Sequence, residues 1–99
     1  MIRVLAVSLS GSEHIIIGKV VDRQSVPFSS EDDARSHLTR IGWSDQRMMV
    51  DEQVLENGRI RTTWDDQSVT EHIKGSGTFE YVRGGPKGGR KISKSEMNQ

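Results

Sequence analysis

The chain has 99 residues, enough for one domain, and it has no cysteine, which excludes disulfides, thiolate catalysis and cysteine-ligated zinc. Hydrophobic residues make up only 32% of it, so the core is small, and a core shared with a second copy, as in a homodimer, would add stability. The formal net charge is zero, but residues 1–74 hold nine Lys/Arg and twelve Asp/Glu while residues 75–99 hold five and two, which predicts an acidic body and a basic tail.

The first predicted element is a β-strand over residues 2–9, which is apolar on both faces, as is typical of a strand covered on two sides. Its longest apolar run, Val4 to Val7, is far shorter than the ~20 residues of a membrane-spanning helix, so we expect a cytoplasmic protein without membrane contacts. Residues 14–22 are rich in β-branched side chains and predict a second strand, antiparallel to the first. Gly18 within it indicates a bulge or a close backbone approach.

Residues 30–41 predict the main α-helix. Serine at its start accepts hydrogen bonds from free N–H groups of the first turn, and Glu31, Asp32 and Asp33 lie at the positive end of the helix dipole. Gly42 supplies the left-handed residue that ends a helix.

Residues 46–55 and 59–64 predict two further strands, joined by Asn57-Gly58, a pair that favours a hairpin turn. The even-numbered residues of the first strand are the more apolar set, so we expect them to face the core. In the second strand we expect Ile60, Thr62 and Trp64 to face the core and Arg59, Arg61 and Thr63 to face outward.

Residues 65–75 have an acidic start and end on Gly75, which predicts a short second helix, and residues 78–83 predict an edge strand. The order ββαββ predicts an α+β fold in which a small antiparallel sheet packs on one main helix. We therefore expect a single domain over residues 1–83 and a flexible, basic, glycine-rich tail over residues 84–99.

No stretch of the chain matches a metal-binding or catalytic motif. The three histidines, His14, His37 and His72, lack metal-ligand spacing. Asp65-Asp66 after a strand is typical of a Mg²⁺ site, but capping of the following helix is the favoured interpretation. The sequence thus predicts a protein that is not an enzyme and has no metal and no cofactor.

Two groups of cations have alternative interpretations. Arg59 and Arg61 point the same way from one strand, so they either contact phosphates or a carboxylate-rich partner, or pair across the sheet with Asp51 or Glu52. The stretch Arg83-Gly84-Gly85 is similar to RGG elements that bind single-stranded nucleic acids. In that interpretation Tyr81 and Phe79 stack on bases, and the phosphates are bound by Arg83, Lys87, Arg90, Lys91 and Lys94.

Part of this pattern, over residues 1–66, resembles a family of small uncharacterised bacterial and phage proteins, a domain of unknown function. The matching pieces are IRVLAV, HIIIGKV, SSEDDARSHL and Arg61-Thr62-Thr63-Trp64-Asp65. In that family a leucine-rich segment is expected after the aspartate, and here the stretch DQSVTEHIKG stands in its place. The resemblance implies a shared fold and, because the family has no established activity, no particular function.

These observations predict a small non-enzymatic binding or regulatory protein, of phage or mobile-element origin, that acts through protein–protein contacts of its acidic body. The acidic partner-binding residues are then Glu31, Asp32 and Asp33, placed so as to imitate phosphates. The alternative is a nucleic-acid-binding protein that uses Arg59, Arg61 and the RGG-like tail.

Overall fold

Strands dominate the computed structural model, which describes residues 1–88 and 96–97, with 49% strand and 11% helix. The predicted α+β fold, a small sheet packed on one main helix, is therefore wrong. The elements in chain order are β1 (Val4–Val7), β2 (Glu13–Ile16), β3 (Gly18–Val21), β4 (Gln24–Pro27), α1 (Glu31–Arg40), β5 (Ser44–Val54), β6 (Arg59–Trp64), β7 (Val69–Ile73), β8 (Phe79–Arg83) and β9 (Glu96–Met97).

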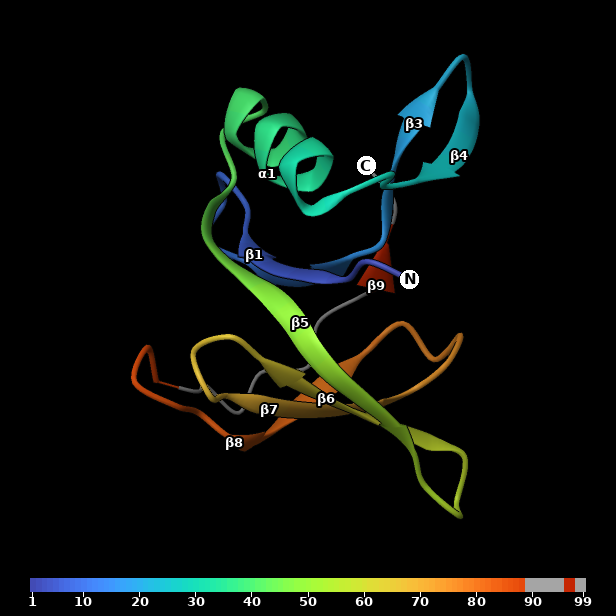
Figure 1. The fold of residues 1–99 in the computed structure, drawn as a ribbon, viewed down its shortest axis with the longest axis vertical. Helices are drawn as coiled ribbons and strands as arrows, with labels where there is room; N and C mark the ends of the chain where they lie inside the picture. Colours follow the sequence, from blue (N-terminus) through green and yellow to red (C-terminus); the bar gives the residue numbers. More distant parts are fainter. Residues whose placement is uncertain (89–95, 98–99) are drawn as a thin grey trace.

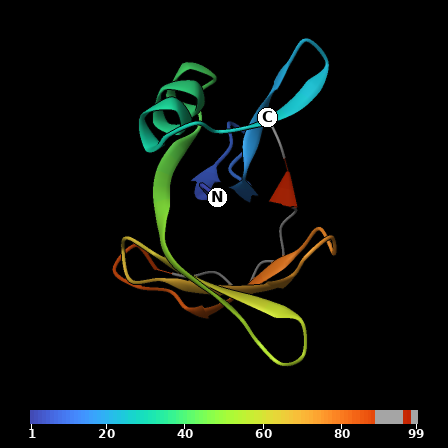
Figure 2. The same cartoon turned by 45° about the vertical axis from the view of Figure 1, so that its right-hand side comes forward.

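One curled sheet forms the body, with the strand order β8-β7-β6-β5-β1-β2-β9. Neighbouring strands are antiparallel except β2 and β9, which are parallel. The eleven-residue β5 passes from the β1–β2 half of the sheet to the β6–β8 half, so the antiparallel strands form a half-barrel (Figures 1 and 2). The curl brings β8 and β2, which are far apart in strand order, toward one another.

The core has two parts, one on each side of β1. Side chains of α1, β1, β2 and β5 pack together above the sheet, and those inside the half-barrel include Leu5, Ile15, Trp64 and Phe79. Val4 and Ala6 point toward α1, whereas Leu5 between them points into the half-barrel. The predicted strand with two covered faces is thus confirmed for Val4–Val7, whereas Leu9, at the end of the predicted range, lies beyond the strand and is exposed.

The predicted main helix is also confirmed, and its start is held by reciprocal hydrogen bonds. Ser30 is the N-cap, and its hydroxyl accepts from Asp33 N at 3.0 Å. The Asp33 carboxylate in turn accepts from Ser29 N at 3.0 Å. Beyond the helix, Gly42 has a φ of +88°, as expected for the residue that ends it.

The strand predicted over residues 14–22 is two strands. β2 ends at Ile16, and β3 pairs with β4 in a separate two-stranded ribbon that projects beside α1 (Figure 1). At Gly18 a Cβ atom would lie 2.2 Å from Val26 O, so the close backbone approach predicted for this glycine is confirmed. Lys19 Nζ lies 2.6 Å from Asp33 Oδ1 and ties the ribbon to the helix.

The second helix predicted over residues 65–75 is wrong. Gln67 N donates to Trp64 O at 2.9 Å and closes a turn, in which Gln67 has a φ of +73°, and β7 follows. Val69, Thr70 and Ile73 are β-branched, and pairing with β6 on one side and β8 on the other satisfies the backbone of this segment. Tertiary pairing thus outweighs the acidic start and the glycine stop.

Candidate functional site

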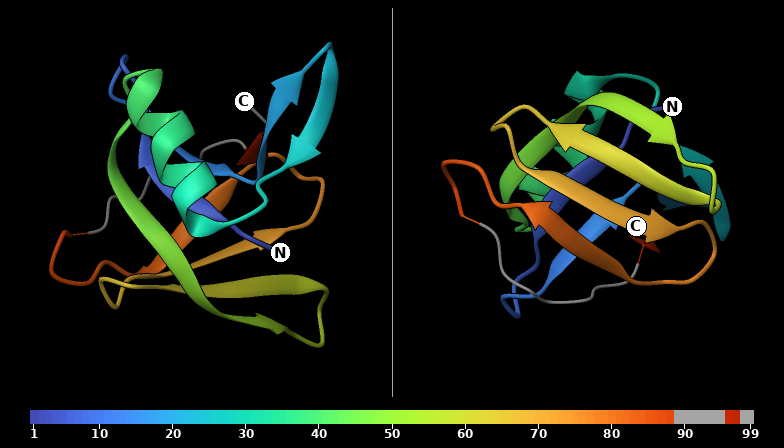
Figure 3. Two further views of the ribbon diagram at one scale, coloured as in Figure 1. Left: turned by 45° about the horizontal axis from the view of Figure 1, so that its top comes forward. Right: turned by 90° about the horizontal axis from the view of Figure 1, so that it is seen from below.

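The outer face of β5–β8 is the candidate site. This face, which we call the outer face, is the side of these strands turned away from the half-barrel interior, and no described helix or strand lies over it (Figure 3). Strand register places on it Asp51 and Gln53 of β5, Arg59, Arg61 and Thr63 of β6, Val69, Glu71 and Ile73 of β7, and Glu80 and Arg83 of β8. The predicted inward set of β6, Ile60, Thr62 and Trp64, is buried and therefore confirmed.

Two β-bulges add a valine each to the outer face. In the β5–β6 pairing the register shifts between Met49 and Asp51, and β5 has the additional residue. In the β7–β8 pairing it shifts between Val69 and Thr70, and β8 has the additional residue. The additional residues are Val50 and Val82, which are 61% and 54% exposed. A bulge residue points to the same side as its neighbour. The prediction that even-numbered residues of β5 face the core therefore fails at Val50, whereas register places Glu52 and Val54 on the interior side, where both are exposed.

These valines extend an aliphatic row across four strands. Register pairs Asp51, Thr63, Val69 and Arg83 across the four strands. The bulge residues Val50 and Val82 lie beside the two charged ends, and with Thr63 and Val69 they make up what we call the aliphatic row. Val69 is 8% exposed, whereas the two ends of the row are more than half exposed. Because its two ends are exposed aliphatic side chains, this row is a candidate contact surface.

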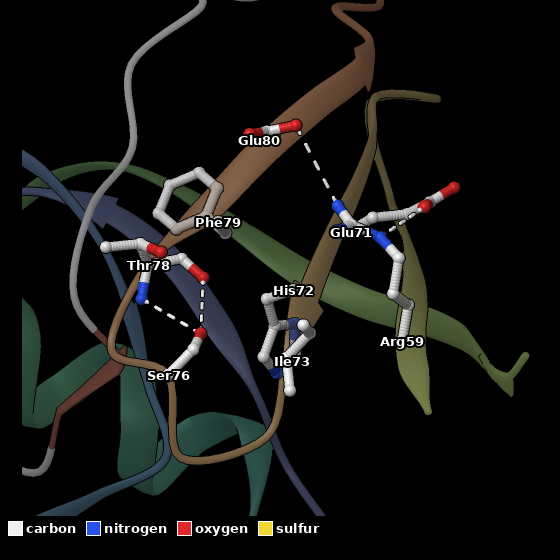
Figure 4. A pocket seen from close by; sticks show the side chains of 8 residues that line it. All are labelled: Arg59, Glu71, His72, Ile73, Ser76, Thr78, Phe79 and Glu80. Carbon is white, nitrogen blue, oxygen red and sulfur yellow. Dashed lines mark hydrogen bonds and ion pairs between the residues drawn. The ribbon is translucent and has the colours of Figure 1, made fainter. Parts of the chain in front are cut away.

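A charged row lies beside the aliphatic one. Glu71 accepts hydrogen bonds from Arg59 Nε at 2.9 Å, from Arg61 Nε at 2.9 Å and from Arg61 Nη2 at 2.6 Å. The bonds from Arg61 first, and then those from Arg59, hold the pKa of Glu71 below its usual value. Arg59 also lies 3.8 Å from Glu80, between the two glutamates (Figure 4).

Cross-strand pairing of Arg59 and Arg61 was one of the two predicted alternatives, but its partner is Glu71 rather than Asp51 or Glu52. Register explains the difference, because Arg61 lies directly opposite Glu71 on β7. Glu52 lies on the interior side, where it accepts from Arg3 Nε at 3.2 Å.

A small pocket adjoins the charged row at the end of β7 and β8. Its volume is about 80 Å³, and it is lined by Arg59, Glu71, His72, Ile73, Ser76, Thr78, Phe79 and Glu80 (Figure 4). Ligand pockets for drug-sized molecules have volumes of roughly 300–1,000 Å³. The pocket is thus a recess in the surface and does not define a small-molecule site.

A buried polar cluster closes one end of the half-barrel and includes Tyr81, one of the predicted nucleic-acid contacts. The Tyr81 hydroxyl donates to the Glu13 carboxylate on β2, which links the two facing strands β8 and β2. Burial first, and then this hydrogen bond, raise the pKa of Tyr81. Its hydroxyl also accepts from Arg47 Nη1 at 3.0 Å, so Tyr81 is engaged in the fold instead of being held out to stack on bases.

Arg47 is the centre of this cluster, and the sequence analysis did not single it out. Its side chain is 3% exposed, and it binds Asp45 Oδ2 at 3.0 Å and Asp66 Oδ2 at 3.3 Å. Asp66 also accepts from Ser68 N at 2.9 Å, so it caps a turn and not the predicted helix. An arginine within a strand of mixed polarity gives no sequence signal of burial, because two of its partners, Asp66 and Tyr81, lie far along the chain on other elements.

The last residue of β8 and the described part of the basic tail, residues 84–88, contact the β6–β7 turn and β5. Arg83 Nε donates to Gln67 O at 2.9 Å, and Lys87 Nζ lies 3.3 Å from Asp45 Oδ1. Gly85 lies so close to the β6–β7 turn that a Cβ atom there would be 2.6 Å from Asp66 O. Three predicted contacts, Arg90, Lys91 and Lys94, lie outside the described residues. The division into a domain over 1–83 and a flexible tail over 84–99 stays a prediction.

The acidic start of α1 is only partly available to a partner. Asp33 is held by Lys19 and Ser29, and the hydrogen bond from Lys19, followed by that from the Ser29 backbone, lowers its pKa to about 2. Glu31 and Asp32 are exposed. Of the three predicted acidic contacts, Asp33 therefore serves the helix cap, and the other two face solvent.

Within residues 1–88 and 96–97, no three His, Asp or Glu side chains come close enough together to hold a metal ion. Asp65 lies 3.7 Å from Arg35, and Asp66 pairs with Arg47. The one helix in this part of the chain has ten residues, which is too few to cross a membrane. Searches of protein-family models, curated proteins and solved structures found no match to the chain, so the resemblance to a family of bacterial and phage proteins stays a prediction.

Proposed function

We propose that this chain is a small, non-enzymatic binding protein that acts through contact with another protein. The observation that carries the proposal is the outer face of β5–β8, where the half-exposed aliphatic row lies beside paired Arg and Glu side chains. Burying this row in an interface would release the water that now covers it. Aliphatic centres flanked by arginine and other polar groups are typical of protein–protein interfaces.

Nucleic acid fits this surface less well. Arg59 and Arg61 share Glu71, so a phosphate that approached either guanidinium would meet a carboxylate beside it. Arg83 and Lys87 are likewise engaged with the body of the protein. Nucleic-acid binding, the alternative, therefore depends on Arg90, Lys91 and Lys94.

The exposed start of α1 supplies a second contact for a partner with a basic surface. Glu31 and Asp32 stand free of the capping bonds that hold Asp33, so they add negative charge that a cationic partner would neutralise. On this proposal the outer face provides the affinity, and the helix start contributes to the choice of partner. A regulatory role in a phage or mobile element is consistent with a binding protein of this size.

The proposal is tested by capture of proteins from a cell lysate on the immobilised full chain, with and without nuclease. We expect a protein to be retained after nuclease treatment and to be lost when Val50→Asp and Val82→Asp are combined. Val20→Asp is the matched control, because Val20 is 55% exposed on the separate β3–β4 ribbon.

Two outcomes would overturn this proposal. Capture that disappears with nuclease, or on replacing Arg90, Lys91 and Lys94 with serine, would show that the chain binds nucleic acid. Capture that is unaffected by the paired valine substitutions would show that the outer face is not the binding surface.

A further inference from the structure

We infer that the partner that fits the outer face is a second copy of this chain, packed sheet on sheet about a two-fold axis parallel to the strands. The inference rests on the proposed function and names the occupant of its surface. An axis in this direction, between β6 and β7, exchanges β5 with β8 and β6 with β7 while keeping each residue at its own height along the strands. Every cross-strand row then faces the same row of the second copy, with the order of the four strands reversed.

The aliphatic row is complementary to its own reverse. Thr63 meets Val69 of the second copy, and Asp51 at one end meets Arg83 at the other. Val50 and Val82, beside these two residues, come within about one residue spacing of one another along the strands. The two bulges thereby place the two most exposed valines of this face, one in each outer strand, against one another. Aligned packing of two sheets, with strand directions within about 30°, is a standard arrangement in β-proteins.

The charged row is complementary in the same way. Its positive side chains, Arg59 and Arg61, lie on β6, and its negative ones, Glu71 and Glu80, lie on β7 and β8. The two-fold axis brings Arg61 opposite Glu71 of the second copy in both directions. Glu71 has three bonds from two arginines already, so the added contact extends a network instead of breaking one.

Balanced charge and small size favour a second copy over other occupants. A nucleic acid would meet Glu71 and Glu80 as well as the arginines, and the outer face itself, which carries both signs of charge, does not select for a strongly charged protein. The accessible surface of the chain is 5723 Å². A stable interface takes about 800 Å² per partner, which is roughly a seventh of that surface.

The absence of cysteine makes a directional crosslinking experiment available. Single variants Val50→Cys and Val82→Cys are prepared in the full chain and treated with a thiol crosslinker of about 8 Å reach. The inferred axis puts Val50 beside Val82 of the second copy, whereas two copies of the same valine lie roughly 14 Å apart, three strand spacings of about 4.8 Å. We expect the mixture of both variants to crosslink at least tenfold faster than either alone, and Val20→Cys to crosslink with neither.

Sedimentation equilibrium measures the self-association of the parent chain, so it complements the crosslinking and does not depend on the folding of any variant. We expect a concentration-dependent rise from the monomer to the dimer mass below about 1 mM, and dimer dissociation constants at least 100-fold weaker for the combined Val50→Asp and Val82→Asp substitutions. The Val20→Asp control should associate like the parent chain. Circular dichroism establishes that each variant is folded.

The inference is overturned if the parent chain stays monomeric, if the crosslinking yield is equal within and between the two cysteine variants, or if the paired aspartates leave the dimer intact. These results are separable from a failure of the proposed function. If the chain is monomeric but still captures another protein through Val50 and Val82, the proposed binding function is supported and the inferred dimer is contradicted.

Discussion

On the inner face of β5–β8, Trp64 and Phe79 are almost fully buried, and Trp64 Nε1 donates to Thr70 Oγ1 at 3.0 Å. On the outer face of the same strands, Val50 and Val82 are more than half exposed. The inner face thus buries its large aromatic side chains, whereas the outer face exposes aliphatic ones to solvent. This contrast between the two faces is the reason for proposing a partner on the outer side.

The largest expected effect comes from breaking the inner face. Trp64→Ala removes a large side chain from the centre of the half-barrel, and we expect the free energy of unfolding to fall by about 4 kcal/mol. Val82→Ala on the outer face should change it by less than about 0.5 kcal/mol in the monomer. Urea unfolding followed by circular dichroism measures both, and similar losses for the two variants would contradict the contrast between the faces.

A somewhat smaller effect is expected from the polar cluster that closes the inner space. Arg47→Met leaves Asp45 and Asp66 without their main cation, and we expect a loss of about 3 kcal/mol because Asp66 is almost fully buried. The matched control is Arg61→Met on the outer face, where the side chain is 42% exposed and the expected loss is below about 1 kcal/mol. Equal losses in urea unfolding would show that the cluster contributes no more than a surface ion pair.

The smallest effect concerns the pH dependence of the outer face. The folded-state pKa of Glu71 is lowered by Arg61 and Arg59, so its contribution is fully present above the unfolded pKa of about 4.3 and is lost as the pH falls through the folded value. We expect the parent chain to exceed Glu71→Gln in stability by less than about 1 kcal/mol at pH 7, and this difference to shrink below about pH 5. Urea unfolding at pH 7, 5 and 3 measures it, and a difference that is constant with pH would contradict the ion pairs.

Local signals in the sequence predict much of the upper half of the molecule. The serine and acidic residues at the start of α1, and Gly42 at its end, determine the helix within one residue at each terminus, because capping depends on groups close in the chain. The doubly apolar pattern of residues 2–9 likewise predicts that β1 is covered by α1 on one face and by the half-barrel on the other.

The parts that could not be predicted depend on contacts between distant residues. A helix and a strand were both compatible with residues 69–73, and pairing with β6 and β8 decides between them. The bulges at Val50 and Val82 contain no glycine, so no sequence signal predicts them. They nevertheless determine which side chains lie on the outer face. Arg47 is buried by Tyr81 and Asp66, which lie 34 and 19 positions along the chain, so its role appears only when β5, β8 and the β6–β7 turn come together.

The bulge in β8 also bears on solubility. Within the described residues β8 is the last strand on its side of the sheet, and a regular edge strand offers its free backbone groups to any passing chain, which leads to open-ended aggregates. The shift at Val82 interrupts the even spacing of those groups and makes lateral strand addition unfavourable. The bulge residue Val82 thus has two effects. It adds an exposed aliphatic side chain to the face inferred to form the dimer, and it makes open-ended strand addition at the edge of β8 unfavourable.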